Sequence, residues 1–393
     1  MRIGIISSGT IFDRVPPIYG GGIQKYVWNL GRYLKKSGHI VHIFAKQQPG
    51  QLKEEFLDGI HIHRISNSVK MKTLSTFIFG LKVLLKILQI QKKEGRFHIL
   101  HAQSRVSGLI IRSFLRDLPF LITAHNWDIA LTSPGRFLHG FTYAIIYFIE
   151  KRVYSQCNAI ITLTSFFQRV LHERYNIPLT KTYVIPNMVD IEAIEWKTNK
   201  IQPRPKKIFM NPYLLFIGRL EQEKGCDYLI KKFNILAKQN PSVQLVFIGS
   251  GTLKSNLNKI KKALNCGDRI HILGVLHESQ LCHLLKKANA LILPSQFELM
   301  PTVVLEAWAA GCPVIVNRFL GIHGFIHHKS TGLLFRLNNS SQLLVNIQEL
   351  LRDQELKQKI IQNAKILVTT KYNAPHVVKQ ILKIYRKLIA RCN

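Results

Sequence analysis

Short apolar runs alternate with helix-period segments along most of the chain. The N-terminal half contains the runs RIGIIS, HIVHIFA, HIHRIS, FHILHAQ, PFLITAH, NAIITLT and TYVIP. Between the first two runs, apolar residues at Ile23, Tyr26, Val27, Leu30 and Leu34 mark one face of a helix. This alternation predicts a mostly parallel sheet with helices on both of its faces.

A second series of the same kind occupies the C-terminal half. It follows residues 191–212, whose three prolines, four lysines and weak periodicity predict a linker. Its expected strands are YLLFIG, VQLVFIG, RIHILG, ALILP, PVIVN and TGLLF, and the chain closes with an amphipathic helix. We therefore expect an α/β protein with two Rossmann-like domains and a cleft between them.

Length and composition support two packed domains. The chain has 393 residues, of which 47% are apolar, so each half can bury a core of its own. The six cysteines stand singly and fit a reducing cytoplasm. The start, MRIGIISSG, lacks the apolar core of a signal peptide. Lys82 and Lys86 interrupt residues 74–90, and residues 141–149 are too short to span a membrane, so we expect no transmembrane helix.

Positive charge is spread over the whole chain. There are 55 lysines and arginines against 22 acidic residues, which gives a net charge of +33. Such a surface attracts nucleic acid, anionic lipid headgroups or phosphorylated metabolites, and it is equally typical of a general lysine bias. A nucleic-acid-binding protein should also carry basic and aromatic clusters or a binding motif. The sequence shows neither, so we expect no nucleic-acid partner.

A glycine run precedes the first expected helix. Ligands of open parallel sheets bind beyond the carboxyl ends of the strands, and the N–H groups of Gly20, Gly21 and Gly22 could contact a phosphate there. A simple turn between strand and helix explains the same residues. The dinucleotide fingerprint needs a glycine where Lys25 stands, which disfavours an NAD site.

Charged residues follow two further strands. Arg219 and Lys224 come after YLLFIG, where two cations would neutralise a diphosphate and stabilise it as a leaving group; ordinary surface cations remain the alternative. His125 ends the run PFLITAH. It could hydrogen-bond a substrate hydroxyl or assist at a developing positive centre, although one of 16 histidines can equally be structural.

Two glutamates flank the start of a short expected helix. Pro301 suits its first turn, and the helix continues from Thr302. Backbone N–H groups from Met300 onward would hold a phosphate, while Glu306 could bind a ribose diol and Glu298 a sugar. Alternatively, Glu306 is an exposed helical residue and Glu298 is a charge at the helix start.

Six motifs in this order resemble those of glycosyltransferase family 4, a group of retaining enzymes with the GT-B fold. They are GGGIQKYVWNLGRYLKKSGHIVHIFA, TAHN, VIPNMVD, FIGRLEQEKGCDYLI, LVFIGSGTLKSNL and LPSQFELMPTVVLEAWAAGCPVIV. Glu298 and Glu306 match the E-x7-E motif of that family. The resemblance extends from Met1 to about Arg391. It implies an acceptor-binding domain at 1–195, a nucleotide-sugar-binding domain at 205–374, and a helix at about 375–393 that packs back on the first domain.

The resemblance also implies an activity and a site. The expected enzyme is a retaining glycosyltransferase of the hexosyltransferase type. It would move a sugar from a nucleotide-diphospho-sugar to an acceptor hydroxyl with retention of the anomeric configuration, in glycolipid, cell-surface polysaccharide or glycan assembly. Catalytic roles fall to His125 and Glu298. Donor binding falls to Gly21, Gly22, Arg219, Lys224, Glu298, Met300, Pro301, Thr302 and Glu306.

The sequence also bears on the transferred sugar, on metals and on the acceptor. Many family members have an E-G-F-G-x-P run, whereas Leu299 and Pro301 give a shorter E-x-M-P variant here, so the sugar stays open. The chain has no Asp-x-Asp triplet, so we expect neither a metal nor a cofactor. The acceptor is expected to be a glycan or a lipid-linked sugar. Lysines over residues 77–93 could rest on an anionic membrane surface at its cytoplasmic face, and the same stretch is equally typical of a packed surface helix with its lysines outward. A nucleotide-sugar epimerase of the same fold is the alternative within this class.

Overall fold

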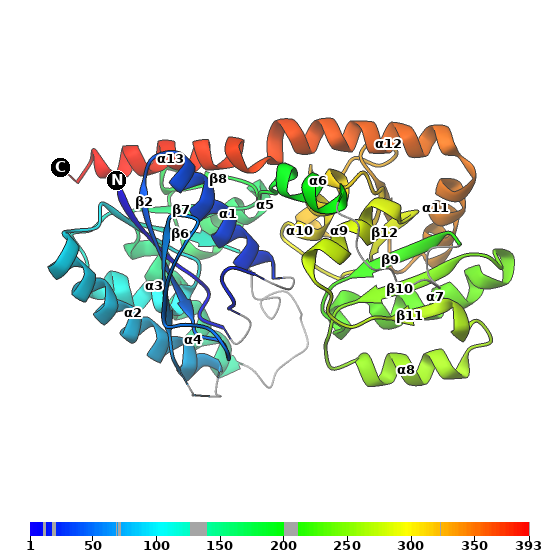
Figure 1. The fold of residues 1–393 in the computed structure, drawn as a ribbon, viewed down its shortest axis with the longest axis horizontal. Helices are drawn as coiled ribbons and strands as arrows, with labels where there is room; N and C mark the ends of the chain where they lie inside the picture. Colours follow the sequence, from blue (N-terminus) through cyan, green and yellow to red (C-terminus); the bar gives the residue numbers. More distant parts are fainter. Residues whose placement is uncertain are drawn as a thin grey trace. The chain divides into compact units, whose positions relative to one another are not determined.

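The protein is seen in a computed structural model that divides into two units (Figure 1). The structure describes residues 1–10, 13–17, 21–67, 69, 72–125, 140–199, 211–322 and 324–392. The N-terminal unit comprises residues 1–187 together with 374–393, and the C-terminal unit comprises residues 188–373. The division therefore falls at Asn187, earlier than the residue 195 expected from the sequence, and the last helix belongs to the N-terminal unit.

The N-terminal unit is built on an eight-stranded sheet in the order β3-β4-β2-β1-β5-β6-β7-β8. Its strands are β1 (Arg2–Ile6), β2 (Ile40–Lys46), β3 (Glu54–Leu57), β4 (Ile60–Ile65), β5 (Ile99–Ala102), β6 (Phe120–Ala124), β7 (Ala159–Thr162) and β8 (Thr182–Val184). All neighbours are parallel except β3, which pairs antiparallel with β4 at the edge. The sequence-based account missed this edge strand.

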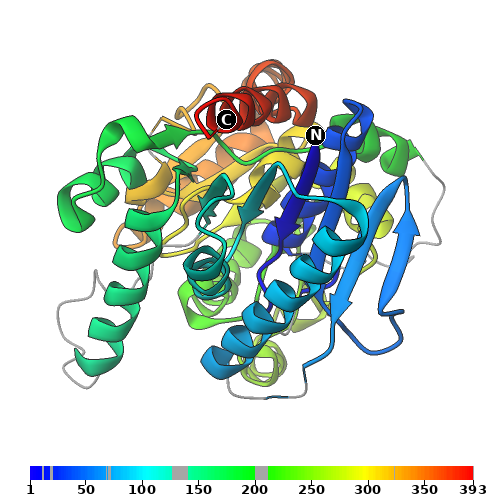
Figure 2. The same ribbon diagram turned by 90° about the vertical axis from the view of Figure 1, so that its left-hand side faces the viewer.

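Helices cover both faces of this sheet (Figure 2). They are α1 (Gly22–Lys36), α2 (Lys72–Glu94), α3 (Arg105–Phe114), α4 (Gly140–Gln156), α5 (Ser165–Tyr175) and α13 (Ala374–Ile389). Helices α1 and α13 pack together, and so do α2 and α3. The apolar stripe of α1 is buried at Tyr26, Val27, Leu30 and Leu34, as its period predicts.

Helix α2 is long and apolar enough to cross a membrane by length and composition alone, and 44% of its most apolar window is buried within the protein. Its side chains Phe79, Val83 and Ile87 are fully buried. These residues recur every four positions and so form one face of the helix. That face belongs to the core of the N-terminal unit.

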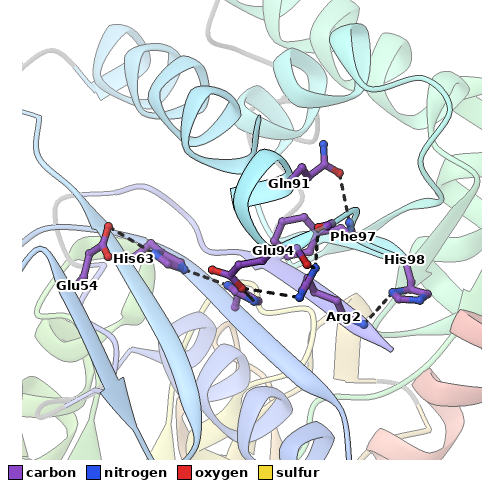
Figure 3. A network of polar contacts seen from close by, with 9 residues as sticks. Arg2, Glu54, His63, Gln91, Glu94, Phe97 and His98 are labelled. Carbon is purple, nitrogen blue, oxygen red and sulfur yellow. Dashed lines mark hydrogen bonds and ion pairs between the residues drawn. The ribbon is translucent and has the colours of Figure 1, made fainter. Parts of the chain in front are cut away.

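Polar contacts join the C-terminal end of α2 to the strands (Figure 3). The guanidinium of Arg2, at the start of β1, donates to the Gly95 carbonyl at 2.7 Å and lies 3.9 Å from the Glu94 carboxylate. Glu94 also lies 3.7 Å from Nε2 of His42, whose Nδ1 is 3.1 Å from Nε2 of His63. This network is at the amino end of β1, opposite the strand ends where ligands are expected.

The C-terminal unit contains a six-stranded sheet in the order β11-β10-β9-β12-β13-β14. Its strands are β9 (Tyr213–Ile217), β10 (Gln244–Ile248), β11 (Ile270–Ile272), β12 (Ala290–Leu293), β13 (Val314–Asn317) and β14 (Leu333–Phe335), and all pairings are parallel. The apolar runs of the sequence predicted each of them.

The helices of this unit lie before, between and after these strands. They are α6 (Ile191–Asn199), α7 (Cys226–Gln239), α8 (Lys254–Ala263), α9 (Glu278–Lys287), α10 (Thr302–Ala309), α11 (Ser340–Arg352) and α12 (Gln354–Leu367). The prediction of a linker over residues 191–212 is wrong for residues 191–199, which form helix α6. Asp190 caps the start of this helix, because its side chain accepts a hydrogen bond from the Ala193 N–H at 3.0 Å. The prolines and lysines that predict a linker do not reveal this cap. Residues 200–210 lie outside the described part of the chain.

Candidate functional site

Two neighbouring strands of the C-terminal sheet end in the segments that the sequence predicts to bind a donor. Strand β9 pairs with β10 on one side and with β12 on the other. The chain leaves β9 toward β10 and reaches β12 later, so the strand order reverses between β9 and β12. Such switch points are where open parallel sheets bind ligands. The loops after β9 and β12, residues 218–225 and 294–301, begin there.

Lys224 and Glu298 meet at this switch point. Lys224 closes the 3-10 helix η4 (Gln222–Lys224), and its ammonium forms a salt bridge with the Glu298 carboxylate. The side chains are only 17% and 19% exposed. Ser295 also donates its hydroxyl to Glu298 at 3.2 Å. The sequence predicts both residues as donor ligands, and the structure brings them into contact across 74 positions of the chain.

The backbone holds these two loops close together. Gly225 follows Lys224 with a φ of +70°, and a Cβ atom there would lie 2.4 Å from the Pro294 carbonyl oxygen. The Gln296 N–H donates to the Glu223 carbonyl at 2.9 Å. A glycine is therefore required at position 225 by both the left-handed conformation and the available space.

Helix α10 carries the second glutamate. It begins at Thr302, and Pro301 is its N-cap with a ψ of 116°. The sequence places Pro301 in the first turn of the helix, and the structure places it one position before that turn. A proline suits this position because it has no N–H group to donate. Met300 is buried, and Glu306 is only 7% exposed. The alternative of Glu306 as an exposed surface charge is therefore wrong.

Arg219 is the most open of the predicted donor ligands. Its side chain is 60% exposed, and one guanidinium nitrogen lies 2.7 Å from the Glu223 carboxylate. It follows β9 by two residues and so shares the carboxyl end of that strand with Lys224.

The N-terminal sheet has its own switch point between β1 and β5. Strand β1 pairs with β2 on one side and with β5 on the other. Gly22 opens α1 and Gly21 is its N-cap, whereas Gly20 lies outside the described residues. The first N–H groups of α1 have no carbonyl one turn earlier within the helix. They follow β1 as the sequence predicts.

A buried carboxylate, Asp13, organises the segment between β1 and α1. It is fully buried, and burial raises its pKa. Its donors are the hydroxyls of Ser7 and Ser8, the N–H groups of Gly9 and Lys46, and the side-chain amide of Gln24 in α1. Asp13 therefore connects the ends of β1 and β2 to the first turn of α1. Sequence reasoning missed it, because a lone aspartate carries no motif.

His125 directly follows β6. Its Nε2 atom lies 2.7 Å from Oε1 of Gln103, and its ring forms a T-shaped pair with the Tyr26 ring, with 4.8 Å between the ring centroids. Burial lowers the pKa of His125 to about 3. The imidazole is therefore neutral near pH 7 and can act there by hydrogen bonding, not as a positive charge. Asn126, Trp127 and Asp128, which follow it, lie outside the described residues.

In the ranges that the structure describes, no group of three or more histidines, cysteines, aspartates or glutamates could hold a metal ion. All six cysteines are free thiols, and five of them are buried.

Comparison with known proteins identifies the family. The model for glycosyl transferases group 1 matches residues 197–367, and the model for glycosyltransferase family 4 matches residues 20–193. The chain belongs to the group 1 glycosyltransferases. Together the two matches contain every predicted site residue, from Gly21 to Glu306.

Similar proteins agree with this assignment. An uncharacterized glycosyltransferase of Methanocaldococcus jannaschii is 25% identical, over 94% of this chain and 95% of its own. Among solved structures, sucrose-phosphate synthase from Thermosynechococcus elongatus has a TM-score of 0.81 at 21% identity and covers 100% of both chains. HepE from Anabaena, solved in complex with UDP-glucose, has a TM-score of 0.72 at 17% identity, over 98% of this chain and 100% of its own. The fold of this glycosyltransferase is GT-B.

Proposed function

We propose that this glycosyltransferase moves a sugar from a nucleotide-diphospho-sugar to an acceptor hydroxyl with retention of anomeric configuration. The observation that carries the proposal is the salt bridge between Lys224 and Glu298 at the β9/β12 switch point. A cation suited to a diphosphate and a carboxylate suited to sugar hydroxyls lie side by side there. The similar HepE structure contains UDP-glucose, which agrees with such a donor.

Each donor-side residue has a role that follows from its chemistry. Lys224 and Arg219 bind the diphosphate, and the N–H groups at the start of α10, near Met300 and Thr302, add donors where the helix dipole favours negative charge. Glu306, buried inside α10, accepts hydrogen bonds from the ribose hydroxyls. Glu298 leaves part of its contact with Lys224 to accept from hydroxyls of the transferred sugar. No metal or cofactor takes part in this proposal.

The reaction then needs positioning and charge stabilisation. The bond between the sugar C1 and the diphosphate oxygen breaks as a bond from C1 to the acceptor oxygen forms on the same face. The acceptor proton passes to the departing diphosphate. Lys224 and Arg219 stabilise the negative charge that grows on that leaving group. His125, neutral near pH 7, orients the sugar by hydrogen bonding.

A product analysis tests this proposal. Purified protein is mixed with UDP-, GDP- or ADP-sugars and with extracted glycans and lipid-linked sugars as acceptors. We expect one nucleotide class to release its nucleoside diphosphate and NMR of the product to show the anomeric configuration of the donor. An inverted product would contradict the retaining mechanism, and conversion of the donor sugar without an acceptor would favour an epimerase.

The acceptor side of the proposal includes an anionic membrane surface. Leu74, Phe77, Leu85 and Leu88 lie on one face of α2 and are between 43% and 66% exposed. The exposed Lys82 lies one turn from Leu85. Apolar side chains with lysines beside them are the composition of helices that rest on anionic lipid. Such a surface would present a lipid-linked acceptor from the cytoplasmic face, where free thiols persist.

Vesicle binding tests this surface. We expect the protein to sediment with phosphatidylglycerol vesicles more than with phosphatidylcholine vesicles, and the double variant Phe77→Ser, Leu85→Ser to lose this preference. Ile366→Ser, which removes a side chain 63% exposed in the C-terminal unit, is the matched control. Equal sedimentation with both lipids would contradict membrane docking.

A further inference from the structure

Gln103 lies where three strand ends of the N-terminal sheet meet. It follows β5, and its backbone N–H donates to the Ile6 carbonyl at the end of β1 at 2.8 Å. Its side-chain Oε1 lies 2.7 Å from Nε2 of His125, beyond the end of β6. Gln103 is only 5% exposed. Three strands therefore fix the position of its amide relative to the imidazole.

The contact determines which nitrogen of His125 carries the proton. An amide oxygen can only accept, so the Nε2 atom that faces it must carry the hydrogen. A neutral imidazole has one N–H group, which leaves a lone pair on Nδ1. The edge-on ring of Tyr26, 4.8 Å away at 78°, limits rotation of the imidazole.

We propose that Gln103 is a positioning residue that fixes His125 as the Nε2–H tautomer, so that Nδ1 accepts a hydrogen bond from a hydroxyl of the transferred sugar. The proposal rests on the proposed function. It makes His125 an acceptor at a defined atom. Neither the motifs nor the spacing of the sequence point to Gln103.

The side-chain Nε2 atom of Gln103 also indicates that a ligand binds beside His125. Its Nε2 atom is buried and has no hydrogen-bond partner in the described part of the chain. A buried donor without a partner is costly, typically about 1–3 kcal/mol. The same side chain thus holds His125 with its oxygen and offers an N–H group to an oxygen of the incoming sugar.

NMR of the protein labelled with ¹⁵N-histidine tests the tautomer without any substrate. We expect the ring nitrogens of His125 at pH 7 to show a protonated Nε2 and an unprotonated Nδ1, and Gln103→Leu to change this pattern. A Gln103→Glu variant keeps the acceptor and adds a charge. It should retain Nε2–H and move protonation of the ring to a higher pH.

Activity profiles give a second readout. Gln103→Leu should lower kcat by about tenfold, the loss expected for one hydrogen bond in a site. In Gln103→Glu, kcat should fall on acidification from pH 7 to 5, a range in which the wild-type imidazole stays neutral. Gln244→Glu is the matched control, because the Gln244 Oε1 atom lies 2.9 Å from Nε2 of His271 in the C-terminal unit. Its profile should match the wild type.

The outcomes separate this inference from the proposed function. A protonated Nδ1 in the wild type, or an unchanged pattern in Gln103→Leu, would overturn the role of Gln103 while leaving glycosyl transfer intact. Failure to turn over any nucleotide-sugar would remove the proposed function, and the NMR result would still decide the tautomer. A Gln103→Glu profile equal to that of Gln244→Glu would also overturn the inference.

Discussion

The Nδ1 atom of His101, at the end of the chain's fifth strand β5, lies 2.7 Å from the hydroxyl of Tyr385 in the last helix α13. Both residues are fully buried. His101 Nε2 is in turn 2.7 Å from Oγ1 of Thr123 in β6. A continuous polar contact therefore connects the final helix to two central strands of the N-terminal unit, to which residues 374–393 belong.

Removing the Tyr385 hydroxyl should destabilise the N-terminal unit. In Tyr385→Phe, the Nδ1 atom of His101 loses its partner inside the core, and we expect a loss of about 1–3 kcal/mol in the free energy of unfolding. Urea denaturation measures it. Tyr147→Phe is the control, because the Tyr147 hydroxyl donates to the Arg174 carbonyl at an exposed position. Equal stability of the two variants would contradict a structural role for the contact.

Acidification should destabilise the fold through its buried histidines. Burial lowers the pKa of His42 and His101 to about 3 and that of His63 to about 4, from the usual 6.5. Between these values and 6.5 the unfolded chain binds more protons, so the free energy of unfolding falls as the pH falls through that window. Each histidine adds up to about 1.4 kcal/mol per pH unit. Denaturation at pH 7, 6 and 5 measures the slope; a flat profile would contradict burial of these rings.

Lys224 and Glu298 should matter far more for the transfer rate than an exposed ion pair elsewhere in the C-terminal unit. We expect Lys224→Ala and Glu298→Ala each to lower the transfer rate by about a hundredfold or more, because each removes a contact to a charged transition state. Lys329→Ala is the control, since Lys329 pairs with Glu349 and is 52% exposed in the same unit. Near-normal turnover in both site variants would exclude this site.

Gly225 offers a test of the loop geometry. Gly225→Ala and Gly324→Ala both place a side chain at a φ near +70°, but Gly324 has nothing within 4 Å of its added Cβ. Gly324→Ala should cost only the conformational penalty of about 1 kcal/mol. Gly225→Ala should cost clearly more and reduce activity as well, because the methyl group forces Lys224 away from residues 294–298. Thermal denaturation and turnover of both variants measure the difference.

The sequence predicts the strands well because helices cover both faces of the sheet, so that the strands are apolar runs. It missed β3, whose residues EEFL are too polar and short to stand out, and α6, which lies in a lysine-rich stretch. For Lys224 and Glu298, the sequence predicts only that each residue follows a strand. It does not predict their contact. That β9 and β12 are neighbours depends on the strand order, which the runs do not contain.

The N-terminal site residues show the same limit. The position of His125 at a strand end is visible in the run PFLITAH, but its neutral state follows from burial by residues distant in sequence. Gln103 and Asp13 are ordinary polar residues in the sequence. Only the meeting of several strand ends gives them partners.

A thermal-shift titration measures whether Lys224 and Glu306 bind the donor. Wild type, Glu306→Ala, Lys224→Ala and the control Lys329→Ala are each heated with UDP, GDP, ADP and their sugar conjugates. A ligand that binds only the folded protein raises the melting temperature. We expect one nucleotide class to stabilise wild type and Lys329→Ala but neither site variant. Equal stabilisation of all four proteins would contradict donor binding at Lys224 and Glu306.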